Sequence, residues 1–454
     1  MNKTWISTTQ EEYWQEQALP LAGASARNIS PNAGNEAGST HLPASLQVTE
    51  EQYQTVDGFG GCFNELGYFA LQQISDEERK EVMKKLFDPD GECRFSICRL
   101  PMGASDYAAE WYSLNETDGD YAMEHFSIER DKQVLIPYIK EALRWNPNLT
   151  LFASPWSPPT WMKHPKAYNY GTLRWEPDVL QAYALYFVKF VQAYAEEGIT
   201  IHQVYVQNEP VADQKFPSCV WTGEQLRDFI RDYLGPAFRE HGLTTEIWLG
   251  TINGPDPYRQ ENTDYDVYAN VVLSDPEARQ YISGVGYQWA GKYALQRTVE
   301  SYPELRYMQT ENECGDGTNS WEYAHYVFNL YKHYFTNGVN SYIYWNMVLE
   351  PGGRSTWGWA QNAMITADPD TERVVFNPEY YVMRHYSHFI QPGAVRLGIR
   401  GTSAGNALAF QNPDGGRIVI VANPFKEPRT LSLQVGSESI SCELPALSFH
   451  TFKI

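Results

Sequence analysis

The sequence predicts an α/β fold, a (β/α)8 TIM barrel that carries an accessory antiparallel β-sandwich domain. Three observations lead to this prediction. The chain has 454 residues, which is more than one ordinary domain needs. Short apolar runs alternate with helical stretches from about residue 55 onward. After about residue 390 the helical spacing ends, and only strand-like runs joined by tight turns remain.

Eight short runs of β-type residues are the predicted barrel strands. They are Phe59–Phe63, Phe95–Leu100, Leu149–Ser154, Gln203–Gln207, Glu246–Gly250, Ile282–Tyr287, Arg306–Thr310 and Ser341–Trp345. The predicted helices between them include Asp76–Phe87, Glu129–Trp145, Val179–Glu197 and Gly223–His241, the last with Thr222 as its N-cap. Strands that alternate with helices pair in parallel, and eight of them close into a barrel.

The sandwich is predicted from the pattern at the two ends of the chain. Strand-like runs follow the barrel at Val395–Ile399, Ala407–Gln411, Arg417–Ala422, Thr430–Val435 and Ser448–Ile454, with a tight turn at 413–416. Leu46–Val48 adds a strand just before the barrel. We therefore expect residues 1–50 to contribute to the sandwich, residues 51–389 to form the barrel and residues 390–454 to form the rest of the sandwich.

Charge and cysteine usage limit the classes of partner. The formal net charge of −21 repels phosphate backbones and anionic lipids, so nucleic acid is not an expected partner and a neutral substrate fits better. The six cysteines form no CxxC pair, which argues against a zinc site. No apolar run is long enough to span a membrane, and the first residues lack an apolar signal region. We expect a cytoplasmic protein, or a secreted one if a native signal precedes this sequence. The sequence predicts no oligomeric state.

Two glutamates follow predicted barrel strands, at the end where active sites of such barrels form. Asn208 and Glu209 follow the fourth strand, and Glu311 follows the seventh. A single Glu in such a place is usually a solvated loop residue. Two of them across a narrow barrel can flank one glycosidic bond, as glycoside hydrolysis requires. An amide beside Glu209 can in addition bind the 2-hydroxyl of a sugar.

Six ordered motifs resemble glycoside hydrolase family 30, which includes glucosylceramidases and β-1,6-glucanases. The motifs are QTVDGFGG at 54–61, CRLPMGASDY at 98–107, FASPWSPPTWMK at 152–163, VQNEP at 206–210, QTENECG at 309–315 and YWNMVLEPGG at 344–353. The resemblance implies a retaining double displacement with Glu209 as acid/base and Glu311 as nucleophile. Glu313 competes for the second role, but Glu311 directly follows the strand. Cys314 is expected to be a small side chain that packs near the site.

The resemblance also implies a set of sugar-binding residues. They are Arg99, Asp106, Trp156, Asn208, Tyr287, Trp289, Trp345 and Asn362. Asp106 can accept hydrogen bonds from two adjacent hydroxyls, and Trp156 and Trp345 can form the floor and wall of the pocket. Arg99 can hold a carboxylate, or it can form an ion pair inside the barrel with no substrate role. Trp161 is expected in the core.

One residue departs from the family pattern, because Gln288 stands where the glucosylceramidase-like pattern has His. This leaves the leaving-group side open, and two Trp residues in the segment 354–361 can line it. β-Xylosidase activity on the same scaffold and a non-catalytic carbohydrate-binding protein are the alternatives. A metal-dependent hydrolase is a third, but its nearest ligands, His385 and His388, are expected to pack between the domains. No cofactor or metal is predicted, since carboxylates alone can supply both catalytic roles.

Overall fold

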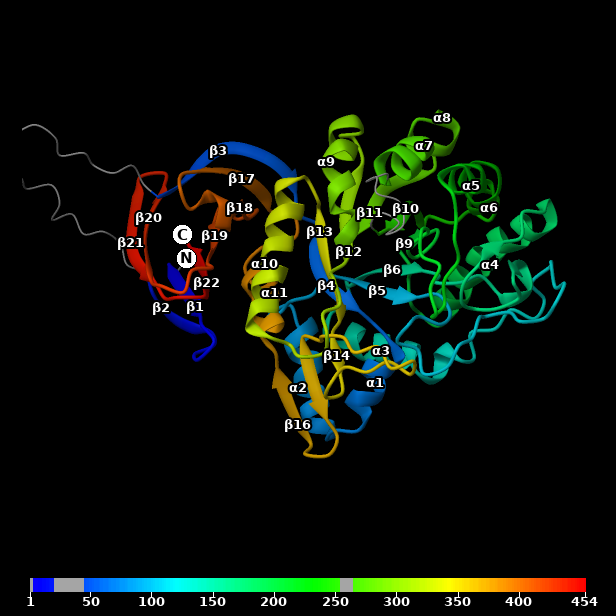
Figure 1. Ribbon diagram of the computed structural model, residues 1–454, viewed down its shortest axis with the longest axis horizontal. Helices are drawn as coiled ribbons and strands as arrows, with labels where there is room; N and C mark the ends of the chain where they lie inside the picture. Colours follow the sequence, from blue (N-terminus) through cyan, green and yellow to red (C-terminus); the bar gives the residue numbers. More distant parts are fainter. Residues whose placement is uncertain (1–2, 20–44, 254–263) are drawn as a thin grey trace, which may run out of the picture.

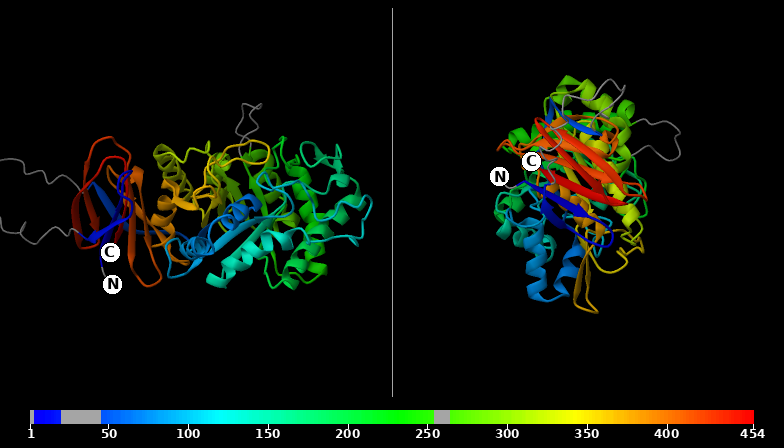
Figure 2. Two further views of the ribbon diagram at one scale, coloured as in Figure 1. Left: turned by 90° about the horizontal axis from the view of Figure 1, so that it is seen from below. Right: turned by 90° about the vertical axis from the view of Figure 1, so that its left-hand side faces the viewer.

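The computed structural model describes residues 3–19, 45–253 and 264–454. Figure 1 shows two parts side by side, with the sandwich at the left and the barrel at the right. The two further views in Figure 2 show that the first and last strands both lie in the sandwich. The predicted combination of a barrel with a β-sandwich is confirmed.

Eight parallel strands close into the barrel in their order along the chain. They are β4 (Gly58–Cys62), β5 (Ile97–Pro101), β6 (Thr150–Ser154), β9 (Gln203–Tyr205), β10 (Glu246–Ile252), β11 (Ile282–Gln288), β12 (Arg306–Glu311) and β13 (Ser341–Asn346). All eight predicted strands are confirmed, with ends that differ by no more than about two residues.

Helices cover the outside of the barrel (Figure 1). They are α1 (Glu65–Gln72), α2 (Asp76–Phe87), α3 (Leu135–Trp145), α4 (Pro177–Glu196), α5 (Gly223–Phe229), α6 (Gly235–Glu240), α7 (Asn270–Leu273), α8 (Pro276–Arg279), α9 (Lys292–Ser301), α10 (Trp321–Thr336) and α11 (Pro378–Ser387). Short 3-10 or π turns lie at η2 (Asp131–Gln133), η3 (Thr160–Met162), η4 (Ile230–Leu234), η5 (Asp264–Ala269), η6 (Trp289–Gly291) and η7 (Ala404–Asn406).

The helix start predicted at Thr222 is confirmed by a capping box. The Thr222 hydroxyl accepts from the Gln225 backbone N–H, and the Gln225 side chain accepts from the Thr222 N–H. The helix predicted over 223–241 is not continuous, because the π turn η4 interrupts it between α5 and α6. The helix predicted from residue 129 begins later, at Leu135, after η2.

The sandwich is one nine-stranded sheet that folds over its own apolar core. Its strands are β1 (Thr4–Thr8), β2 (Gln15–Ala18), β3 (Leu46–Thr55), β17 (Val395–Arg400), β18 (Ala407–Gln411), β19 (Arg417–Asn423), β20 (Arg429–Val435), β21 (Glu438–Leu444) and β22 (Ser448–Lys453). Its pairings are antiparallel except that of β3 with β20. β21 is not among the predicted strands, since it is an edge strand with polar residues at most positions.

The N-terminal strands join this sheet through long-range pairing. β1 pairs with β22, and β3 pairs with both β17 and β20. Because β3 continues to Thr55, the expected boundary at residue 50 falls within a strand. The division of the chain into domains at residues 50 and 389 stays a prediction.

His385 lies where α11 meets the sandwich, as the sequence predicts for it. Its two ring nitrogens contact the hydroxyls of Thr451 on β22 and Thr8 on β1, each at 2.8 Å. His388 contacts the Glu92 carbonyl at 2.8 Å. Two small sheets complete the fold: β7 (Lys163–His164) with β8 (Thr172–Leu173), and β14 (Val348–Leu349) with β15 (Ile365–Asp368) and β16 (Arg373–Phe376).

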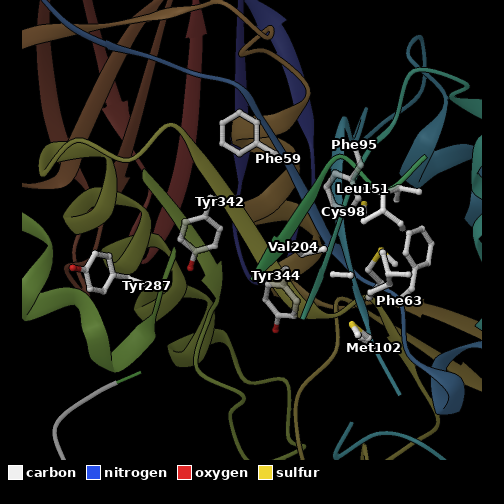
Figure 3. Close-up of a cluster of buried hydrophobic side chains, with 14 of the residues drawn as sticks. Phe59, Phe63, Phe95, Cys98, Met102, Leu151, Val204, Tyr287, Tyr342 and Tyr344 are labelled. Atoms are coloured by element: carbon white, nitrogen blue, oxygen red, sulfur yellow. The ribbon is translucent and has the colours of Figure 1, made fainter. Parts of the chain in front are cut away.

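Side chains of the barrel strands alternate between two environments, as the two-residue period of a strand requires. Outward-facing residues such as Leu151, Val204 and Tyr342 belong to the layer of apolar side chains between strands and helices (Figure 3). The inward-facing residues form a separate apolar cluster of Ile97, Phe152, Tyr205, Trp248, Met308 and Ile343. This cluster fills the barrel below the residues described next.

Candidate active site

Arg99 is the centre of the polar group inside the barrel. It lies on β5, two residues beyond Ile97 of the apolar cluster, and its side chain is 0% exposed. Its Nη1 donates to Glu311 Oε2 at 2.5 Å, and its Nη2 donates to Asn208 Oδ1 at 2.6 Å and to Ser154 Oγ at 2.8 Å. One guanidinium therefore links residues from four strands or strand ends.

The rings of two tryptophans lie against the guanidinium group. The Arg99 Cζ lies 4.4 Å from the centroid of the Trp156 ring and 5.5 Å from that of Trp345. The two rings are 5.4 Å apart and inclined by 31°. Burial between aromatic faces removes water from the ion pair, which strengthens its electrostatic interaction. The structure thus brings both predicted tryptophans and the predicted arginine together.

Glu311 ends β12 and is 5% exposed. Tyr287 pairs with Gln309, but Gln288 pairs with Glu311, so β12 has one extra residue at this point. The extra residue aligns Glu311 with Gln288, whose Nε2 donates to Glu311 Oε2 at 3.0 Å. Burial raises the pKa of Glu311 well above its usual value, Glu209 and Asp106 raise it further, and Arg99 opposes this.

Glu209 lies in the loop after β9 and has φ of 49°, which is uncommon for a residue other than glycine. Two backbone hydrogen bonds hold it there: its N–H donates to the Thr251 carbonyl at 2.9 Å, and its carbonyl accepts from Ala212 at 2.8 Å. Asn253 Nδ2 donates to Glu209 Oε1 at 2.8 Å. Burial raises the pKa of Glu209, while Asn253 and Arg99 lower it.

Asp106 is a third carboxyl group of this site. It is 7% exposed, and its Oδ1 is buried with no hydrogen-bond partner among the described residues. Gln361 Nε2 lies 3.4 Å from the other oxygen. Burial and the charge of Glu209 raise the pKa of Asp106 to about 7. An unsatisfied buried oxygen is costly, so Asp106 is ready to accept hydrogen bonds from a ligand.

Trp289 begins η6 directly after β11 and is partly buried. The neighbouring Ala290 N–H donates to Asn253 Oδ1 at 3.0 Å, so this turn is tied to the residue that contacts Glu209. Trp289 therefore lies beside the mouth of the barrel.

Two predicted sugar-binding residues are placed elsewhere. Tyr287 lies on the outer face of β11, where its hydroxyl is 2.5 Å from Thr298 Oγ1 on α9, and Figure 3 shows it among the buried apolar side chains. Its side chain therefore does not join the group around Arg99, because adjacent strand residues face opposite sides and Gln288 takes the inward side. Its sugar contact stays a prediction.

Asn362 likewise does not contact the side chains around Arg99, and its role as a sugar ligand stays a prediction. Its Nδ2 donates to Glu379 Oε1 at 2.8 Å, and its Oδ1 accepts from the backbone of Gly317 at 2.8 Å and of Asn319 at 3.2 Å. Both ends of the amide are thus used to hold the loop after β12. The preceding residue, Gln361, approaches Asp106 instead.

Glu313 has separate surroundings from Glu311. It interacts with Tyr326 and with Lys292, and its backbone carbonyl accepts from Asn312 Nδ2 at 2.7 Å. In the described part of the chain, Arg99 forms its carboxylate ion pair with Glu311 and not with Glu313. Cys314 packs against the cluster that contains Trp156 and Trp345, in keeping with its expected packing role.

Four residues of the site are absent from the sequence-based prediction: Ser154, which accepts from Arg99, and Thr251, Asn253 and Gln361. Thr251 Oγ1 donates to Asn208 Oδ1 at 3.1 Å, Asn253 contacts Glu209, and Gln361 contacts Asp106. The fifth strand was expected to end at Gly250, and its extension to Ile252 places Thr251 and Asn253 at the mouth. Their position just after an apolar strand was the available signal. Gln361 had no such signal, since it lies in a long loop.

Among the described residues, no group of three or more His, Cys, Asp or Glu side chains is arranged to hold a metal ion. No helix in the described part of the chain is long and apolar enough to cross a membrane.

Known proteins are similar to this chain in sequence and fold. Residues 56–390 match the model of the glycosyl hydrolase family 30 TIM-barrel domain, and residues 393–452 match that of the glycosyl hydrolase family 30 beta sandwich domain. Lysosomal acid glucosylceramidase of Mus musculus is 29% identical over 451 residues, which cover 91% of this chain and 83% of that protein. An endo-1,6-β-D-glucanase of Neurospora crassa is 27% identical over 398 residues, 82% and 79% of the two chains.

A solved endo-β1,6-glucanase superposes with a TM-score of 0.86 at 25% identity and covers 100% of this chain and 99% of its own. The chain is therefore a glycosidase that acts on carbohydrate, and it belongs to glycoside hydrolase family 30.

Proposed function

We propose that this protein is a retaining β-glucosidase that works by double displacement, with Glu311 as nucleophile and Glu209 as acid/base. The main support for the proposal is that the Arg99 side chain donates hydrogen bonds both to Glu311 and to Asn208, the residue before Glu209. This arrangement supports the approach of two carboxyl groups, from β12 and from the loop after β9, to one sugar. Retaining enzymes have such groups about 5–5.5 Å apart, and we expect that separation here.

In the first step, a Glu311 oxygen attacks the anomeric carbon while Glu209 gives its proton to the leaving oxygen. Burial raises the pKa of Glu311, and the ion pair with Arg99 and the hydrogen bond from Gln288 oppose this effect and favour the ionised form that attack requires. The raised pKa of Glu209 favours the protonated form that donation requires.

In the second step, water hydrolyses the glycosyl-enzyme. Glu209, now ionised, takes a proton from the water, which attacks the anomeric carbon and releases Glu311. Asp106 would accept hydrogen bonds from sugar hydroxyls with its unpartnered Oδ1. Asn208 Oδ1 is occupied by Arg99, Thr251 and Gln288, so its Nδ2 is the group left for the 2-hydroxyl.

The proposed substrates are β-glucosides, either short β-1,6-gluco-oligosaccharides or glucosides of the glucosylceramidase type. The names of the relatives support both, since one is a glucosylceramidase and another an endo-1,6-β-D-glucanase. Aromatic side chains near the mouth of the barrel could stack against the leaving group of such a substrate. Trp357 lies 4.7 Å from Trp111, and Trp359, which is 37% exposed, lies 5.9 Å from Phe216.

A screen of aryl β-glycosides tests the sugar. We expect the glucoside to be cleaved in preference to the xyloside, galactoside and fucoside, and gentiobiose and β-1,6-glucan then test the linkage. Preference for the xyloside would replace the proposal by β-xylosidase activity. Binding of glucosides without cleavage of any of them would favour a non-catalytic carbohydrate-binding protein.

Azide rescue tests the two glutamates separately. In Glu209→Ala, activated aryl glucosides still form the intermediate, and azide should release it as the β-glucosyl azide. In Glu311→Ala, azide in the vacated space should give the α-glucosyl azide. Proton NMR distinguishes the two products. The same anomer from both variants contradicts the division of roles, and loss of activity in Glu313→Ala but not in Glu311→Ala would move the nucleophile by two residues.

A further inference from the structure

Asn253 lies between the proposed acid/base and the turn after β11. Its Nδ2 donates to Glu209 Oε1 at 2.8 Å, and its Oδ1 accepts from the Ala290 backbone N–H at 3.0 Å. The backbone contact joins the loop after β10 to the neighbouring turn. The other Glu209 oxygen, Oε2, accepts no hydrogen bond from the described residues.

The contact with Ala290 decides which way the Asn253 amide points. A backbone N–H can only donate, so the amide atom that faces it must be the oxygen. The atom that faces Glu209 must then be the NH2 group, which has no hydrogen-bond acceptor function. Glu209 Oε1 is consequently held as an acceptor.

A carboxyl group that accepts a hydrogen bond at one oxygen carries its proton preferentially on the other, because the carbonyl oxygen is the stronger acceptor. A proton on Oε1 would weaken the hydrogen bond from the Asn253 NH2 group at 2.8 Å. The hydrogen bond therefore favours the proton on Oε2. We propose that Asn253 is a positioning residue that reserves Oε2 of Glu209 for the proton transferred to the leaving group in the first step and taken from water in the second.

The charged groups around Glu209 do not select between its oxygens in this way. Arg99 acts on Glu209 through its charge, and Asp106 and Glu311 are coupled to Glu209 as like charges. These interactions change how easily Glu209 ionises. Among the residues that the structure describes, Asn253 is the one that forms a hydrogen bond with a single Glu209 oxygen.

This inference rests on the proposed role of Glu209, and a series of aryl β-glucosides tests it. In Asn253→Leu both oxygens can carry the proton. For glucosides of phenols that are poor leaving groups, we expect kcat/KM to fall by about 10-fold, because the leaving oxygen needs a correctly placed proton. For the dinitrophenyl glucoside, kcat/KM should change by less than about 2-fold. The basic limb of the profile of kcat/KM against pH should move to higher pH by about one unit, because the Glu209 carboxylate loses its hydrogen-bond donor.

Asn253→Asp is the second variant, and it is nearly isosteric. Its carboxylate can still accept from Ala290 but offers an acceptor to Glu209, so it should draw the proton to Oε1. The loss on poor leaving groups should then exceed that of Asn253→Leu, and the basic limb should also move up. This variant keeps the test decisive if Asn253→Leu does not fold.

Asn412→Leu is the matched control. Asn412 accepts from the Gln391 N–H at 3.0 Å and donates to the Phe389 carbonyl at 2.8 Å, so both ends of its amide are also used, here to hold the segment after α11. It should lower the Tm and leave the leaving-group dependence unchanged. If both Asn253 variants lower kcat/KM equally for all leaving groups and leave the pH profile unmoved, Asn253 only anchors the loop and the inference is overturned. Failure of azide to rescue Glu209→Ala would instead remove the proposed role of Glu209, and with it this inference.

Discussion

The two ends of the barrel interior differ sharply in chemistry, although the same strands build them. Toward the start of the strands, Ile97, Phe152 and Ile343 form part of a closed apolar cluster. Two residues further along each strand stand Arg99, Ser154 and Trp345, which surround the site. The lower layer has the composition of a stable core, whereas the upper layer buries charge.

The upper layer holds polar groups that burial penalises. Glu311 and Asp106 are both nearly buried with raised pKa values, and Asp106 Oδ1 has no partner among the described residues. Such groups reduce stability unless a ligand satisfies them. The lower layer therefore stabilises the fold, whereas the upper layer lowers its stability and provides the groups for binding and chemistry.

The largest expected effect comes from Arg99→Met, which breaks the upper layer. It leaves Glu311 buried without its ion-pair partner, so we expect a loss of about 3–5 kcal/mol in the free energy of unfolding and no measurable hydrolysis. Urea unfolding and an aryl glucoside assay measure the two. Arg99→Met combined with Glu311→Gln should recover most of the stability and none of the activity. If Arg99→Met is as stable as the unsubstituted protein, the ion pair does not stabilise the upper layer.

Trp248→Ala is the corresponding change in the lower layer. Trp248 is fully buried in the apolar cluster, and truncation should cost about 3–5 kcal/mol of stability. At a temperature where the variant stays folded, kcat/KM should remain close to that of the parent. A large fall in kcat/KM without a fall in Tm would show that the two layers are not separable.

Asp106→Asn should increase stability while it decreases activity. The pKa of Asp106 is raised to about 7, so the folded state holds a proton that the unfolded state, with a pKa of 3.8, has already lost. The parent therefore loses stability as pH rises from about 4 to about 7, and the loss persists above that range. Asn cannot ionise, so its Tm advantage should grow across this window and then level off. A Tm difference that does not depend on pH would contradict this explanation.

Tyr287→Phe should have the smallest effect. The hydroxyl contacts Thr298 outside the barrel, so its removal should cost about 1 kcal/mol of stability. KM for an aryl glucoside should change by less than about 2-fold, since the side chain does not face the site. A rise in KM well beyond that would restore Tyr287 as a residue that affects sugar binding.

The sequence by itself determined the strands and several helix starts. The eight barrel strands follow from local apolar runs, and Thr222 follows from cap chemistry within three residues. Position at strand ends also indicated Glu209 and Glu311, because parallel strands bring their C-terminal ends to one mouth. These features depend on short-range patterns, which a single sequence contains.

Tertiary structure alone decided which side chains meet. The extra residue in β12 aligns Glu311 with Gln288, and the contact with Ala290 sets the orientation of Asn253. Asn362 and Gln361 are adjacent in sequence, yet the first holds a loop and the second approaches Asp106. Local propensity does not encode such outcomes, because a shift of one residue reverses the side that a side chain faces, and only packing between distant segments fixes that shift.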